Sequence, residues 1–192
     1  MSSVNLNELR DKAYQCAVVH GWHEQEYSNE HFLCLVISEL MEAIQAERKG
    51  KYSEVGKFKE WQGNSIPFSE ETRLKRFKED FEAYIKDSVE DELSDACIRL
   101  LDLAGLRQLE LTYTNSLAIM SKMSFTEYIY CLCSFITNPD KSNSKWLDNH
   151  ISYCLGWIFS WCRAKNIDIA WHIEQKMKYN QLRPYMHGGK AY

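Results

Sequence analysis

Two stretches of the chain decide its fold: HFLCLVISELMEAIQAERKG at residues 31–50 and SVEDELSDACIRLLDLAG at residues 88–105. In both, apolar side chains recur at the three- and four-residue spacing of an α-helix, and no proline or glycine interrupts them before the terminal glycine. Each stretch also carries acidic side chains on the side away from its apolar residues. We therefore expect two amphipathic helices, each with an acidic stripe.

The rest of the chain predicts more helices and no strand. The whole sequence holds only 3 prolines and 8 glycines, so long segments contain no helix breaker. The expected helices cover residues of about 6–20, 28–50, 69–87, 88–109, 125–136, 145–165 and 168–183. An irregular loop is expected at about 51–68, a connection at 112–123 and a mobile tail at 187–192. The predicted fold is a single all-α domain over residues 1–192, a helical bundle.

Composition excludes several classes of protein. With 192 residues, 45% hydrophobic and 26% charged, the chain has the composition of one globular domain. Its net charge of −4 argues against a nucleic acid polymer as partner. The N-terminus has no apolar signal core, and the apolar stretches are too short for a bilayer. The 7 cysteines form no CxxC pair and suggest reduced thiols. We expect a cytoplasmic protein with no membrane partner.

The acidic stripes contain two pairs with the same spacing, Glu39 with Glu42 and Glu92 with Asp95. Side chains three residues apart on a helix have Cβ atoms roughly 5–6 Å apart. Two carboxylates held that close repel each other unless a cation or a proton lies between them. If the two helices pack side by side, four carboxylates converge, which suits the oxygen-seeking Mg²⁺ ion.

Alternatives remain open for these acids. The acidic stripes can simply be the solvated faces of two helices, and Asp87 with Glu90 is a competing pair at the start of the second helix, which is expected to begin at Asp87 or Ser88. Other metal chemistries find less support. No histidine stands three residues after an acidic residue, which is the Glu-x-x-His spacing of di-iron bundles. No His-Asp dipeptide occurs either, which argues against an HD-type phosphohydrolase.

A basic cluster stands near the end of the chain, in KMKYNQLRPYMHGGKAY at residues 176–192. Lys176, Asn180 and Arg183 share one helix face, which leads into His187 and Lys190. Cations and an amide are groups that bind phosphates. The alternative is a solvated helix end, where the helix dipole favours basic side chains.

Together these pieces resemble the MazG-like all-α nucleoside triphosphate pyrophosphohydrolase superfamily. The matching segments are residues 31–51, 89–105 and 176–190, which carry Glu39-x-x-Glu42, Glu92-x-x-Asp95 and the basic cluster. The chain departs from compact members by some fifty residues between the two acidic motifs, including a charged helix. Residues 112–166 have no clear counterpart in the smallest members and either extend the bundle or build a subunit interface.

The resemblance implies hydrolysis of a nucleoside triphosphate between its α and β phosphates, with Mg²⁺, or alternatively Mn²⁺, as cofactor. It implies metal ligation by Glu39, Glu42, Glu92 and Asp95, and water activation by Glu39 or Glu42. Phosphates would meet the C-terminal residues Lys176, Asn180, Arg183, His187 and Lys190. Candidates for stacking on the base are Trp22, Trp61 and Tyr179. A homodimer or homotetramer is expected. The rival function is a non-catalytic helical binding or assembly module.

Overall fold

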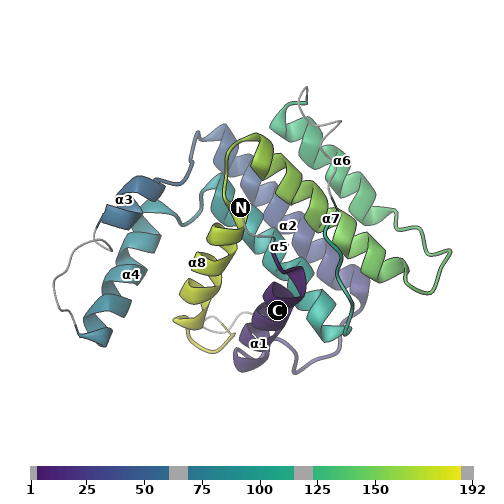
Figure 1. Ribbon diagram of the computed structural model, residues 1–192, viewed down its shortest axis with the longest axis horizontal. Coiled ribbons are helices and arrows are strands. Elements are labelled where there is room, and N and C mark those ends of the chain that lie inside the picture. The colour runs from purple at the N-terminus through teal and green to yellow at the C-terminus, as the bar shows by residue number, and fades with distance from the viewer. Residues whose placement is uncertain (1–3, 61–68, 115–122, 187–192) are drawn as a thin grey trace.

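The computed structural model describes residues 4–60, 69–114 and 123–186, and over these residues the chain is all-α, as predicted. Figure 1 shows the arrangement of the helices. They are α1 (Leu6–Val19), α2 (Asn29–Arg48), α3 (Val55–Glu60), α4 (Glu70–Tyr84), α5 (Val89–Leu106), α6 (Phe125–Thr137), α7 (Trp146–Ala164) and α8 (Ile169–Gln181). The expected tail at 187–192, with His187 and Lys190, and the expected base-stacking candidate Trp61 lie outside the described residues.

Polar caps set the beginnings of most helices. The side chains of Ser28, Ser69 and Ser88 each accept a hydrogen bond from a backbone N–H three residues on, and Asp168 does the same for α8. These interactions satisfy N–H groups that have no partner within the helix. The helix starts predicted near these residues are confirmed.

The predicted loop at 51–68 is partly wrong, because its first half contains the short helix α3. Phe58 of α3 is fully buried and packs edge-on against Phe77 and Phe81 of α4. A six-residue helix that contains Gly56 gives no periodic signal of its own, so tertiary packing accounts for it. Helix α5 also ends at Leu106, short of the predicted limit at residue 109.

Helices α2 and α5 are antiparallel neighbours. At one end Arg107 Nε donates to Asn29 Oδ1 over 2.8 Å, so the end of α5 meets the start of α2. At the other end the backbone N–H of Val89 donates to the carbonyl of Lys51 over 3.0 Å. The two acidic motifs therefore face each other across one helix pair, as predicted.

Helix α5 is the centre of the molecule, with α1, α2, α7 and α8 packed around it (Figure 1). Most of its residues are buried, including its acidic residues Asp91, Glu92 and Asp102. Helices α6 and α7 add their apolar faces to the same core, so in this chain they extend the bundle.

A second, smaller core lies on the side of α8 that is opposite the main core. It joins α3 and α4 to α8 through the side chains of Phe58, Phe77, Phe81, Ile85 and Tyr179. Figure 1 shows α3 and α4 apart from the main bundle and next to α8. The segment between the two acidic motifs is thus tied to the helix that carries the basic cluster.

The cysteines are free thiols, as expected, and Cys97, Cys154 and Cys162 are buried. Among the described helices, none combines the length and apolarity needed to span a bilayer.

Candidate functional site

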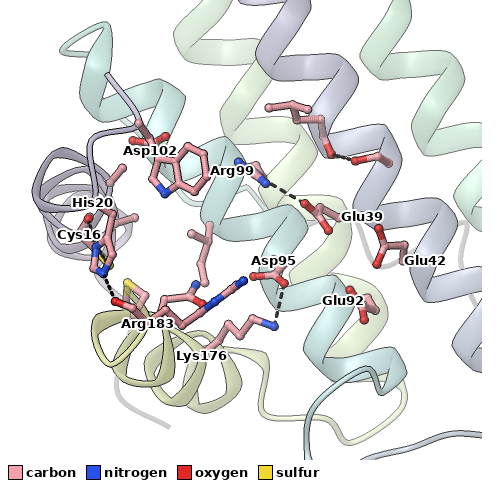
Figure 2. A pocket seen from close by; sticks show the side chains of 18 of the residues that line it. Cys16, His20, Glu39, Glu42, Glu92, Asp95, Arg99, Asp102, Lys176 and Arg183 are labelled. Atoms are coloured by element: carbon pink, nitrogen blue, oxygen red, sulfur yellow. Dashed lines mark hydrogen bonds and ion pairs between the residues drawn. The ribbon is translucent and has the colours of Figure 1, made fainter. Parts of the chain in front are cut away.

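A cavity of about 360 Å³ lies between α1, α2, α5 and α8. Its volume is within the range of small-molecule sites. All four residues of the acidic motifs line it, together with three residues of the basic cluster: Glu39, Glu42, Glu92, Asp95, Lys176, Asn180 and Arg183. Figure 2 shows the acids of α2 and α5 on one side and Lys176 and Arg183 reaching toward Asp95 from the other.

Three of the four motif carboxylates converge. One oxygen each from Glu39, Glu92 and Asp95 lies within 4.8 Å of the others. Glu39 and Glu92 are only 9% and 5% exposed. The interpretation of these acids as solvated helix faces is therefore wrong for Glu39 and Glu92.

Glu42 is exposed and stands outside this group, although it lines the same cavity. The core face of α2 is centred on Val36, Leu40 and Ala43, all fully buried. At about 100° per residue, Glu39 points about 70° from that centre and Glu42 about 130°. This rotation explains why only Glu39 is drawn into the interior. The structure therefore brings together three of the four predicted ligands.

Lys176 is buried between acids, not exposed at a solvated helix end. The side chain is 6% exposed, and its Nζ lies 2.8 Å from Asp91 Oδ2 and 2.8 Å from Asp95 Oδ2. The Phe81 ring also contacts the lysine, with its centroid 5.8 Å from Nζ. Burial lowers the pKa of Lys176, but Asp95 and Asp91 outweigh it and raise the net value. The alternative interpretation of Lys176 as part of a solvated helix end is therefore wrong, because α8 packs against α5 and α4 on the side that carries Lys176.

Burial and mutual repulsion perturb the acids strongly. Burial, reinforced by Asp91 and Asp95, raises the pKa of Glu92 to about 8. Burial also raises the pKa of Asp91 to about 6, although Lys176 opposes the shift. For Glu39, burial and the charge of Asp95 raise the pKa against the pull of Arg99. These carboxyls favour a proton or a cation over an unneutralised charge.

Arg99 and Asp91 complete the acid cluster, and the motif search did not single out either as a site residue. Arg99 Nε donates to Glu39 Oε1 over 3.1 Å. Arg99 stands on the predicted acidic stripe, four residues after Asp95, so spacing could have found it. Asp91 holds Lys176 and also accepts from the backbone N–H of Asp87 over 2.9 Å. Its partnership with Lys176 depends on the packing of α8 against α5.

The two members of the competing acidic pair, Asp87 just before α5 and Glu90 in its first turn, have different surroundings. Glu90 Oε2 accepts a hydrogen bond from the backbone N–H of Ser53 over 2.9 Å, which fastens the segment after α2. Asp87 forms a second close group with Asp91 and Glu92. It pairs with exposed Lys51 and half-buried Lys86, at 3.5 Å and 3.0 Å. Glu90 thus has a structural role.

Asn180 and Arg183 extend the cavity along α8 and beyond it. Asn180 Oδ1 is buried and has no hydrogen-bond partner among the described residues. Burying a polar group without a partner costs stability, so this atom is suited to a ligand. The carbonyl of Arg183 accepts from His20 Nε2 over 3.2 Å, which fixes the backbone at this corner.

At the end of the cavity away from Glu92, Asp102 of α5 lies close to the end of α1. His23 Nε2 donates to Asp102 Oδ1 over 2.7 Å, and both side chains are 10% exposed. Burial raises the pKa of Asp102, while His23 lowers it. Trp22 lines the cavity here. Tyr179, another stacking candidate, instead stacks on Phe81 with ring centroids 4.5 Å apart.

Comparison of the chain with protein-family models, with curated proteins and with solved structures gave no match. The residues that line the cavity therefore indicate what it can bind. The three converging carboxylates offer only oxygen donors, which is the ligand set of Mg²⁺ and Mn²⁺. Asn180 Oδ1, a buried atom without a hydrogen-bond partner in the described ranges, belongs to a residue that lines the cavity and fits a site completed by a bound group.

Proposed function

We propose that the chain is a Mg²⁺-dependent nucleoside triphosphate pyrophosphohydrolase of the MazG-like all-α type. The observation that carries this proposal is the convergence of Glu39, Glu92 and Asp95 from two antiparallel helices beside buried Lys176. A cavity with acids on one wall and cations on the other matches a metal-bound polyphosphate. Hydrolysis between the α and β phosphates would yield a nucleoside monophosphate and pyrophosphate.

Glu39, Glu92 and Asp95 would hold the cation, with Mn²⁺ able to replace Mg²⁺. Bound there, the divalent ion would neutralise phosphate oxygens and lower the pKa of a coordinated water. Arg99 holds Glu39 in place. Glu42 lines the cavity outside the three-carboxylate group, so it is the residue suited to accept a proton from the attacking water. Glu39 then acts as a ligand more than as a base.

The basic cluster would bind the phosphates. Lys176, Asn180 and Arg183 line the same cavity as the acids, and cationic donors give strong hydrogen bonds to phosphate oxygens. Lys176 would have to share Asp95 with the cation, because its Nζ is already 2.8 Å from that carboxylate. Repulsion between the ammonium and the divalent ion would turn Lys176 toward the phosphate. His187 and Lys190 remain proposed phosphate contacts.

The rival function, a helical binding module with solvated acids, has less support. Burying several carboxylates around one lysine costs stability, and a mere assembly surface has no need of such a cluster. Association of two or four copies is compatible with either function, and we keep a homodimer or homotetramer as part of the proposal.

A product assay tests the proposal. The protein is incubated with each common ribo- and deoxyribonucleoside triphosphate and Mg²⁺, and the products are separated by ion-exchange chromatography. We expect a monophosphate and pyrophosphate in equal amounts, with activity lost when Mg²⁺ is chelated. Release of orthophosphate, or no turnover of any triphosphate, would refute the function.

A matched pair of variants ties the activity to the cavity. Glu39→Gln keeps the shape of the side chain but removes a ligand charge, so turnover should fall at least a thousandfold. Glu47→Gln makes the same change on α2 away from the cavity and should leave turnover within twofold. Equal activity in the two variants would contradict the metal assignment.

A further inference from the structure

The cavity has two chemically different ends. One end holds Glu39, Glu92 and Asp95, and the other holds Asp102 among side chains that are mainly apolar or aromatic. Figure 2 shows Asp102 on the far side of Arg99 from Glu92 and Glu42. Asp95 and Asp102 are seven residues apart on α5, so about 10.5 Å of helix separates them. That distance is longer than a phosphate group and suits the sugar and base of a nucleotide.

Asp102 is held rigidly. His23 donates to its Oδ1, and the His23 ring contacts the rings of Tyr14 and Phe32, at centroid distances of 5.3 Å and 6.1 Å. A packed and hydrogen-bonded carboxylate cannot turn away from the cavity that it lines. His23 contacts only one of the two carboxylate oxygens, Oδ1. A ligand in this end of the cavity therefore meets a fixed acceptor.

We propose that this end binds the nucleobase and that Asp102 selects bases with an exocyclic amino group, such as cytosine and adenine. The inference rests on the proposed function, because it assumes a nucleotide whose phosphates lie at the acidic end. A carboxylate oxygen only accepts hydrogen bonds. An amino group donates to it, as cytosine N4 donates to Asp and Glu side chains in other complexes.

The keto bases lack this match. Uracil and hypoxanthine carry a carbonyl oxygen where cytosine and adenine carry the amino group, so two acceptors would face each other. A buried acceptor without a donor loses its hydrogen bond to water and gains nothing in return. The wall formed by Ala17, Trp22 and Ile98 gives the flat ring an apolar surface. It contributes affinity to every base and leaves the choice to Asp102.

Binding of nucleoside monophosphates tests the inference without any turnover. Isothermal titration calorimetry with Mg²⁺ measures Kd for two matched pairs, CMP against UMP and AMP against IMP. Each pair differs by one amino-to-keto exchange. We expect the amino member of at least one pair to bind ten times more tightly or better. Equal affinities within both pairs would overturn the inference, and this result needs no variant.

Asp102→Asn supplies the second arm. An asparagine side chain carries a donor as well as an acceptor, so the keto bases should gain affinity and the preference should shrink to threefold or less, or reverse. An unchanged preference in Asp102→Asn would assign the discrimination elsewhere. Thermal melting checks that Asp102→Asn is folded. His23→Leu removes the hydrogen bond that holds Asp102, so it should also reduce the preference for amino over keto bases.

The two proposals fail in distinguishable ways. If Glu39→Gln abolishes turnover while the monophosphate pairs bind equally, the hydrolase stands and the base assignment falls. If the wild type prefers amino bases but hydrolyses no triphosphate, the protein is a nucleotide-binding module with the base site described here.

Discussion

Lys176 lies with its ammonium between Asp91 and Asp95, and Phe81 covers its apolar side. Lys176 is therefore the internal counter-ion of Asp91 and Asp95, as Arg99 is of Glu39. A divalent cation at Glu39, Glu92 and Asp95 would compete with it for Asp95. Binding of a divalent cation would therefore change the partner of Lys176, because the cation would take Asp95 from it.

Removing this lysine should cost far more stability than removing an exposed one. In Lys176→Met, Asp91 stays buried without its partner, and such a loss typically costs about 3–5 kcal/mol. The cost should be smaller at pH 5 than at pH 8, because burial raises the pKa of Asp91 to about 6 and a protonated acid needs no counter-ion. Urea unfolding at both pH values measures the difference.

Two further variants bracket that result. Lys178→Met, on the exposed side of the same helix, should cost less than about 0.5 kcal/mol. The double variant Lys176→Met with Asp91→Asn should recover part of the loss, because it removes both charges of the pair. A loss of equal size at pH 5 and pH 8, with no recovery in the double variant, would mean that packing and not charge accounts for the effect.

Helices α1 and α5 approach each other through Gly105, in the last turn of α5. A Cβ at this position would overlap the side chain of Tyr14 and lie 3.4 Å from the carbonyl of Arg10. This contact sets how closely α1 approaches α5 beside the cavity. Gly56 in α3 has open space around it, with no atom within 4 Å of an added Cβ.

Alanine substitutions at these two glycines should therefore have opposite signs. Alanine favours a helix over glycine by up to about 1 kcal/mol, and Gly56→Ala should gain part of this stability. Gly105→Ala should instead lose about 1–3 kcal/mol, because overpacking outweighs the helix propensity. Urea unfolding of both variants decides the point, and a stabilised Gly105→Ala protein would show that α1 moves aside at little cost.

Helix positions and the facing acidic motifs could be predicted from sequence, because both follow from local rules. Serine caps and uninterrupted apolar spacing fix α2 and α5, and the spacing of Glu92, Asp95, Arg99 and Asp102 places them on one stripe. The position of α8 could not be predicted. It depends on Phe81 and Tyr179, which come together only in the folded chain, and it determines that Lys176 is buried.

Helix α3 and the rotation of α2 escaped prediction for related reasons. The segment around Phe58 forms a helix because Phe58 packs against side chains of α4 and α8. The neighbouring residues in the sequence do not by themselves favour a helix. Glu39 and Glu42 share a spacing that suggests equal roles, yet the core face of α2 buries one and exposes the other. A pair of acids on a helix therefore predicts a site only after the centre of the buried face is known.

The molecule as a whole carries a stability cost in its central helix. Because α1, α2, α7 and α8 surround α5, several carboxyls of α5 cannot reach open solvent. Glu92 and Asp91 have folded-state pKa values raised to about 8 and about 6. These two carboxyls therefore bind more protons in the folded protein than in the unfolded chain between about pH 4 and pH 8. Stability from these protons is complete at low pH and is lost as pH rises through the folded pKa values.

Mg²⁺ should reverse this loss. A ligand that binds only the folded state stabilises it by RT ln(1 + [L]/Kd), or about 1.4 kcal/mol at ten times Kd. Protons compete for the same carboxylates, so the Mg²⁺-induced rise in Tm should be large at pH 8 and small at pH 5. Thermal melts at both pH values, with NaCl at equal ionic strength as control, measure it. Glu92→Gln should flatten the fall in stability without Mg²⁺ and reduce the Mg²⁺ effect, whereas Glu47→Gln should change neither. A Mg²⁺ effect equal to that of NaCl would contradict divalent-cation binding at the cluster, whose counter-charges would then be Lys176, Arg99 and protons.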